Sequence, residues 1–222
     1  MVVDETLKKW HELVVSQVIA DSEEVVFEEG TPSDPSVIYD LLLGAFAERH
    51  RALSAFSVDG TEYINQEDLP NKFNLIEAKS ITHAELTLRL SIQFLNQLSN
   101  FKNQISAYQV NLLVTAWSEV FKRTDDFITK IQPFADLLDN IIPYAQTYAP
   151  EWADDVYKTA ESQAKSLNSI LQCFENSDPA GLSGEIAENL LPLFNSTITL
   201  FENSIIPDLK KRKEEDEKSY TK

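Results

Sequence analysis

Hydrophobic side chains recur every three to five positions from about residue 83 onward. The first stretch carries Leu86, Leu90, Phe94, Leu98 and Ile105. This spacing places the side chains on one face of a helix, because an α-helix completes a turn every 3.6 residues. The pattern predicts one or two long amphipathic helices over residues 83–122.

The same spacing continues in three further segments. One follows Thr124, the next is opened by Pro150, and the last is capped by Ser183 and runs into a charged tail. Four prolines fall inside these segments, at positions 133, 143, 192 and 207. Pro133 and Pro143 should kink the segment after Thr124, since proline removes a backbone donor and its ring collides with the preceding turn. In the last segment the hydrophobic spacing continues through Pro192 and Pro207.

The first third of the chain is also read as mainly helical. We expect one helix from Asp4 to about Ala20, and a second that starts at Asp34 and Pro35 and runs to about Phe56. Residues 22–32, SEEVVFEEGTP, could extend the first helix or form a short extended segment, since so short an apolar run has no clear period. Residues 57–74 are the longest turn-rich connector.

Glycine is scarce in this chain. Only five glycines occur in 222 residues, and none lies between residues 61 and 180. Because tight turns and hairpins usually need glycine, we expect an all-α fold, a bundle of about six or seven long antiparallel helices. The expected parts are an acidic helical segment at residues 1–68, the main bundle at 69–209 and a charged tail at 210–222.

The chain is strongly acidic. Asp and Glu total 36 against 19 Lys and Arg, which gives a net charge of -17. Residues 1–68 hold 15 acidic and 4 basic residues, a net charge of -11. Nucleic acids and anionic membranes are therefore poor partners, because both are bound through cationic surfaces.

The lack of a recognisable secretion signal and the single cysteine indicate an intracellular protein. The N-terminal sequence lacks a basic region followed by an apolar one, and the chain has no apolar run of about eighteen residues. Cys173 is the only cysteine, so an internal disulfide and a paired-cysteine metal site are excluded. We expect a cytoplasmic location.

Two aspartate pairs are the first candidates for a metal-binding site. Asp125 with Asp126, and Asp154 with Asp155, could each contribute carboxylates to a divalent metal ion. If their helices form a hairpin about Pro150, the first pair lies roughly 36 Å from the turn and the second about 6 Å, so they cannot share one ion. We interpret both pairs as acids in the first turns of helices.

No other motif predicts catalysis or cofactor binding. The three histidines, at positions 11, 50 and 83, lack the spacing of metal ligands on a helix. Nucleotide-binding and nucleophile-elbow motifs are absent from the sequence, and Cys173 beside Phe174 resembles a small core residue. We therefore expect no enzyme activity, no catalytic residue, no bound metal and no cofactor.

The hypothesis that remains is a non-catalytic helical module, such as an adaptor, inhibitor, chaperone-like or regulatory factor, that binds a basic surface of another protein. Formation of a homodimer is an alternative that the sequence leaves undecided. The candidate contacts are four glutamates and one aromatic anchor: Glu23, Glu24, Phe27, Glu28 and Glu29. The alternative is a binder of an apolar small molecule in an aromatic-lined bundle core.

A short basic cluster, KKRK at residues 210–213, has two interpretations. It could be a targeting signal, or one face of a solvated helical tail, because each base is followed by an acid four residues later. The sequence favours the solvated tail.

Overall fold

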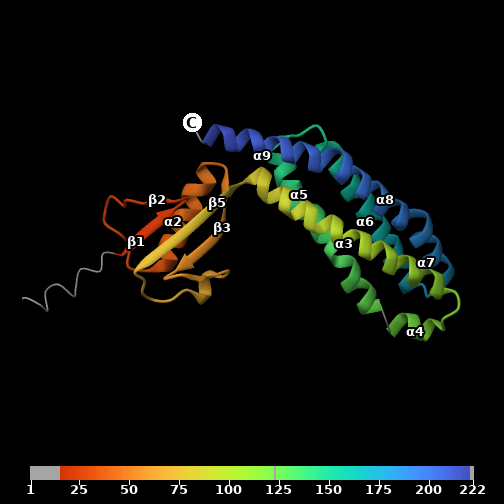
Figure 1. Cartoon of the computed structure of the whole chain (residues 1–222). Helices are drawn as coiled ribbons and strands as arrows, with labels where there is room; N and C mark the ends of the chain where they lie inside the picture. The colour runs from red at the N-terminus through yellow and green to blue at the C-terminus, as the bar shows by residue number, and fades with distance from the viewer. Residues whose placement is uncertain (1–15, 123, 221–222) are drawn as a thin grey trace, which may run out of the picture. The chain divides into compact units, whose positions relative to one another are not determined.

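A computed structural model describes residues 16–122 and 124–220 of the chain. The contacts between residues divide the chain into two compact units, residues 1–83 and residues 84–222. The first unit contains a β-sheet, and the second is helical (Figure 1). We call them the sheet unit and the helical unit.

The sheet unit contains five strands in the order β2-β1-β5-β3-β4. Strands β1 and β5 pair in parallel, whereas β1 with β2, β3 with β4 and β3 with β5 are antiparallel. A short 3₁₀ turn, η1 (Gln66–Asp68), precedes the central strand β5. The strands are β1 (Gln17–Ala20), β2 (Glu23–Glu24), β3 (Arg51–Val58), β4 (Thr61–Glu62) and β5 (Leu75–Thr82).

The prediction of an all-α bundle is therefore wrong: the protein has an α/β fold with a mixed sheet. The helix expected up to Ala20 is a strand over its last four residues, Ser16 before them is not helical, and residues 4–15 lie outside the described residues. Residues 22–32 contain the two-residue strand β2. The helix expected to reach Phe56 ends at Glu48, where β3 follows after a turn.

One helix, α2 (Pro35–Glu48), covers one face of the sheet. Its predicted start is confirmed, because the Asp34 side chain accepts a hydrogen bond of 2.9 Å from the Ser36 amide and Pro35 occupies the first turn. The buried residues of α2 pack on those of the sheet and form one apolar core, which includes Ile38, Leu42, Phe46, Phe56 and Ile76.

The helical unit consists of long helices that run back and forth along one another (Figure 1). The first three long ones are α3 (His83–Leu112), α5 (Thr124–Tyr148) and α6 (Ala153–Glu175), with the short α4 (Trp117–Lys122) before α5. The last comprises α7 (Pro179–Glu185), α8 (Leu191–Leu200) and α9 (Ile206–Tyr220), joined by two π-helical turns, η2 (Ile186–Leu190) and η3 (Phe201–Ile205).

Each π-helical turn comes immediately before a proline-containing turn. The Leu191 amide donates to the Ile186 carbonyl and the Ile206 amide to the Phe201 carbonyl, each across five residues. Pro192 and Pro207 follow directly. The wider turn offers the proline ring room that an α-helical turn lacks, so the chain stays helical through both prolines.

Aromatic rings from three helical segments meet in the core of the helical unit. The ring centroids of Phe94 and Phe201 are 5.5 Å apart, and those of Phe134 and Phe194 are 4.7 Å apart in an edge-on arrangement. All four side chains are buried. Edge-on and offset ring pairs stabilise a core beyond their buried area, which ties α3 to η3 and α5 to α8.

Two predicted helix starts are shifted in the structure. The helix expected to open at Pro150 begins at Ala153, and the helix expected to begin at Ser183 begins at Pro179, where Asp178 caps it by accepting a hydrogen bond of 2.8 Å from the Gly181 amide. Along the described part of the chain, every helix is too short or too polar to cross a membrane.

Candidate functional site

The acidic segment, residues 23–29, lies at one edge of the sheet. Its first two residues, Glu23 and Glu24, form the edge strand β2, and both are exposed. Glu28 and Glu29 are exposed as well. The four predicted contact acids thus all reach solvent. An edge strand also leaves backbone donors and acceptors on its outer side, which other chains can use.

The predicted aromatic anchor of this segment, Phe27, is only partly accessible to solvent. Phe27 is half-buried and packs against the core of the sheet unit. Its neighbour Val26 is 86% exposed and is the apolar side chain that the segment presents to solvent. The four exposed glutamates therefore flank Val26 along the chain, while Phe27 packs the segment against the core of the sheet unit.

A further acid, Asp21, is paired inside the sheet unit. Its carboxylate accepts a hydrogen bond of 2.7 Å from the Ser80 amide, and Arg51 Nε lies 3.8 Å from its Oδ2 atom. Arg51 also donates to the Ser80 carbonyl at 3.0 Å. The charge of Asp21 is thus compensated within the fold, whereas the four glutamates are among the exposed acids that produce the negative field of this unit.

The face of the sheet opposite α2 is polar and open. Ile76, Ala78 and Ser80 point into the buried side of β5, so Glu77 and Lys79 lie on the other side, where both are exposed. Within residues 16–122 and 124–220, no three His, Cys, Asp or Glu side chains lie together in a way that could hold a metal ion.

The two described histidines lie close to Arg51. His50 occupies the turn between α2 and β3, and His83 is the first residue of α3. Burial lowers the pKa of His83, a hydrogen bond with the Arg51 backbone acts in the opposite direction, and the charge of His50 lowers it further. His11 lies outside the described residues.

The aspartate pairs are both placed in first turns of helices. Asp154 and Asp155 are exposed at the start of α6, and Asp155 lies 3.5 Å from Lys158. Asp125 and Asp126 fall in the first turn of α5, and their side chains lie outside the described set.

Cys173 is half-buried near the end of α6. Burial raises the pKa of its thiol, and the charges of Asp178 and Glu185 raise it further. A raised pKa keeps the thiol protonated near neutral pH, so Cys173 lacks the thiolate character of a reactive cysteine.

Part of the basic cluster at residues 210–213 is bound within the helical unit. Arg212 Nε donates to Asp208 at 2.8 Å, and Lys213 Nζ lies 3.3 Å from Glu85 on α3. Lys210 and Lys211 are exposed on α9. The cluster therefore helps to fasten α9, and Lys211 and Lys213 also form the expected pairs with Glu215 and Glu217, four residues later. The alternative of a targeting signal is not tested by the structure.

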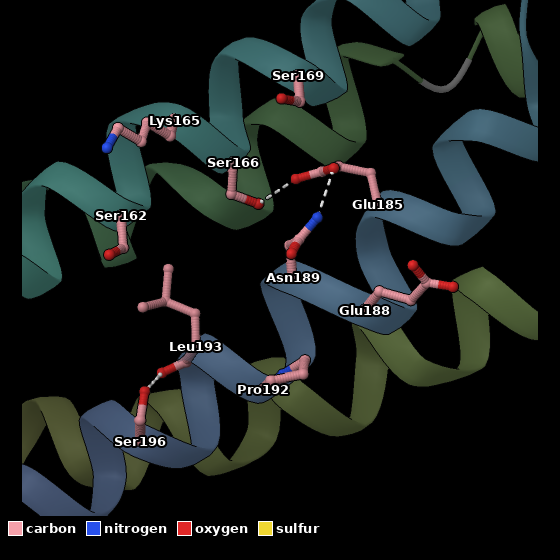
Figure 2. Close-up of a pocket in the computed structure, with 10 residues that line it drawn as sticks. All are labelled: Ser162, Lys165, Ser166, Ser169, Glu185, Glu188, Asn189, Pro192, Leu193 and Ser196. Carbon is pink, nitrogen blue, oxygen red and sulfur yellow. Dashed lines mark hydrogen bonds between the residues drawn. The ribbon is translucent and has the colours of Figure 1, made fainter.

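Two grooves flank α6, and the larger has a mixed polar and apolar lining (Figure 2). It measures about 560 Å³ and lies between α6 and the chain from α7 to α8. Its lining combines four serines with charged, amide and apolar side chains: Ser162, Lys165, Ser166, Ser169, Glu185, Glu188, Asn189, Pro192, Leu193 and Ser196.

Polar groups of this serine-lined groove are largely paired with each other or with nearby backbone. Ser166 donates to Glu185 at 3.0 Å, and Asn189 donates to the other carboxylate oxygen at 2.8 Å (Figure 2). Lys165 forms an ion pair of 2.8 Å with Glu161. Because these groups already have partners, we interpret the groove as part of the packing interface between α6 and the last helix.

The smaller groove, about 340 Å³, lies between α5 and α6 and is apolar. Phe127, Ile131, Ile170 and Phe174 are buried in its floor, whereas Ile128 is 44% and Leu171 45% exposed. Besides these six, its lining includes Gln132 and Leu167. We call it the apolar groove. It offers hydrophobic surface that α5 and α6 do not cover themselves.

Sequence reasoning assigned these groove residues to the inner faces of helices. Phe127 and Ile131 belong to the hydrophobic spacing after Thr124, and Leu171 and Phe174 to the spacing after Pro150, which predicts inner faces of helices. The signal that could have revealed the groove is the width of the stripe: Ile128 beside Phe127, and Leu171 beside Ile170, extend it past the face that one helix needs for packing.

Comparisons with known protein families, with curated proteins and with solved structures found no match to this chain.

Proposed function

We propose that this chain is a non-catalytic, cytoplasmic interaction module that presents an acidic surface to a basic region of another protein. The observation that carries the proposal is the acidic segment, where four glutamates are exposed at a sheet edge around the exposed Val26. A basic residue is absent from residues 23–29. Concentrated charge of one sign attracts an oppositely charged partner and orients its approach.

The local geometry supports contact as well as attraction. The outer edge of β2 can pair with an extended segment of another chain, because backbone donors and acceptors of an edge strand are available there. Lysine or arginine side chains of such a segment would meet Glu23 and Glu24, and its apolar side chains would meet Val26.

The competing explanation is that the acidic residues protect the protein from self-association. Charged side chains on an edge strand discourage pairing with further copies of the same protein and keep it in solution. This explanation needs no partner, and it predicts that no protein is found repeatedly next to Val26.

Site-specific photo-crosslinking separates the two explanations. A photoreactive amino acid would replace Val26 in the full chain, and Ile64, which is 90% exposed and follows the opposite edge strand β4, would be replaced as the matched control. We expect a defined crosslinked protein from position 26, none from position 64, and loss of the product when all four glutamates become glutamine. Equal crosslinking from both positions, or none, would contradict the proposal.

A second candidate function is binding of an apolar small molecule. The aromatic core of the helical unit is filled by packed rings, so the site would be the apolar groove. Its volume of about 340 Å³ falls in the range of ligand pockets, which favours this candidate. Against it, such pockets bury most of their ligand, whereas Ile128 and Leu171 are nearly half exposed along this groove.

A further inference from the structure

We infer that the apolar groove between α5 and α6 is a docking site for an amphipathic helix of a partner protein, and that this helix carries basic residues at both ends of its apolar stripe. The inference concerns the helical unit and does not depend on the acidic segment of the sheet unit.

The shape of the groove fits a helix. Its α6 wall is made by residues 167, 170, 171 and 174, which span about two helical turns, roughly 10 Å. Two helices that pack in parallel or antiparallel leave a groove between their ridges, and a third helix packs its own ridge into such a groove. Apolar side chains of the partner at positions i, i+3, i+4 and i+7 would rest on this floor.

The chemistry of the groove favours burial under a partner. Phe127 and Phe174 form part of the floor, with ring centroids 5.9 Å apart, and Ile128 and Leu171 rise at the rim. In protein interfaces, contacts at the rim of a buried pocket exclude water from its centre, and Ile128 and Leu171 are placed to provide such contacts. Covering them removes apolar surface from water, which stabilises the complex.

Charged residues beside the apolar groove determine which kind of helix would bind there. Asp136 lies one turn beyond Gln132 on α5, and Glu175 lies one turn beyond Leu171 on α6; both are exposed. Because α5 and α6 run in opposite directions, the two acids stand at opposite ends of the groove (Figure 1). The carboxyl end of α6 adds partial negative charge beside Glu175. Lysine or arginine near both ends of the bound helix complements this arrangement.

The same charges disfavour a second copy of this chain as the occupant. Each copy carries a net charge of -17, and two such grooves facing each other would bring like charges together. Lys165 does not compensate the groove, because it lines the opposite side of α6 and pairs with Glu161.

The test uses the full chain and two fluorescein-labelled helical peptides of about eighteen residues, followed by fluorescence anisotropy. Both peptides carry leucine at i, i+3, i+4 and i+7; the first has lysine at its polar positions and the second has glutamate. We expect the lysine peptide to bind at least tenfold more tightly. Leu171→Asp should weaken its binding at least tenfold, and Asp136→Asn with Glu175→Gln about threefold, with a smaller dependence on salt.

Ile92→Asp is the matched control, since Ile92 is 42% exposed on α3 and lies outside the groove. It should change binding less than twofold, and circular dichroism should show that both aspartate variants are folded. Equal weakening by Ile92→Asp and Leu171→Asp, or no weakening by Leu171→Asp, would overturn the inference.

Other occupants give different results. If wild-type protein sediments as a dimer that Leu171→Asp dissociates, the groove binds a second copy and the inference fails. If 1-anilinonaphthalene-8-sulfonate binds in the groove and the lysine peptide does not displace it, the groove is a small-molecule site. Neither result alters the crosslinking expected at Val26, so failure here is distinct from failure of the proposed function.

Discussion

The Ser80 amide donates a hydrogen bond of 2.7 Å to the carboxylate of Asp21, which joins the ends of the parallel strands β1 and β5. Asp21 itself has a φ of 50°, a left-handed conformation that aspartate adopts more readily than most residues. The pair thus fixes both the turn after β1 and the pairing of β1 with the central strand. Arg51, 3.8 Å from Asp21, compensates the charge.

Asp21→Ala should loosen the sheet unit. The variant loses the hydrogen bonds to Ser80 and places alanine in a left-handed conformation, and together these should cost about 2–3 kcal/mol. Asp21→Asn keeps an acceptor and tolerates the conformation, so it should cost about 1 kcal/mol. Hydrogen exchange with mass spectrometry should show faster exchange in β1 and β5, with α5 and α6 as the internal reference. Unchanged protection of β1 would contradict this role.

The scarcity of glycine is a poor guide to this sheet, because most of its turn residues with positive φ are not glycine. Asp21, Ser22, His50 and Asp59 all have positive φ, so four turn positions look ordinary in a sequence searched for glycine. His50 in particular lies in the turn between α2 and β3, where the sequence suggests one continuous helix.

Two signals in the sequence did point to strands. Asp59 with Gly60, both at positive φ, forms the turn between β3 and β4, and an Asp-Gly pair between apolar segments is a strong hairpin signal. Strand β5 alternates buried Ile76 and Ala78 with exposed Glu77 and Lys79, which is the two-residue period of a strand.

The helices of the second unit were predictable because their stripes are long. A 3.6-residue period repeated over α3, α5 and α6 leaves little ambiguity, whereas boundaries depend on single residues such as Asp178. The two π-helical turns and the apolar groove depend on how neighbouring helices pack. The sequence carries only partial signals of them, namely the prolines that follow the two turns and the width of the apolar stripe at the groove.

Trp152→Phe should destabilise the helical unit. The buried indole nitrogen donates a hydrogen bond of 2.9 Å to Asp208, which connects the start of α6 to α9. A hydrogen bond to a charged group contributes about 1.5–3 kcal/mol, and we expect a loss of about 2 kcal/mol in urea unfolding. Trp117→Phe is the control for removal of an indole from a half-buried site. Equal effects of the two substitutions would contradict the importance of the Asp208 bond.

Alkaline pH should destabilise the protein through Tyr144. Burial raises the pKa of Tyr144 to about 12 in the folded state, while its ordinary value is 10. A raised folded pKa favours the protonated hydroxyl, so this stabilisation is complete below pH 10 and is lost as the pH rises through 12. Tyr144→Phe should therefore reduce the fall in unfolding free energy between pH 9 and pH 11.5. An unchanged slope would exclude Tyr144 as its source.

Divalent metals should have no effect on the protein. Isothermal titration with magnesium, manganese, zinc and iron(II) should show no binding of defined stoichiometry, and the melting temperature should not change. Tight binding abolished by Asp125→Ala or Asp154→Ala would restore the aspartate pairs as ligands. Tight binding abolished by Glu77→Gln would instead assign a site to the open face of the sheet and reopen the question of catalysis.

The most direct test of the proposed function is the association rate of the protein captured at Val26. Stopped-flow measurements would compare wild-type chain with the variant in which Glu23, Glu24, Glu28 and Glu29 are glutamine, between 50 and about 300 mM salt, where screening shortens the range of charge interactions. The account predicts that the substitutions and added salt each slow association about tenfold and change dissociation little. An association rate that responds to neither would contradict it, because the acidic segment would then not guide the partner.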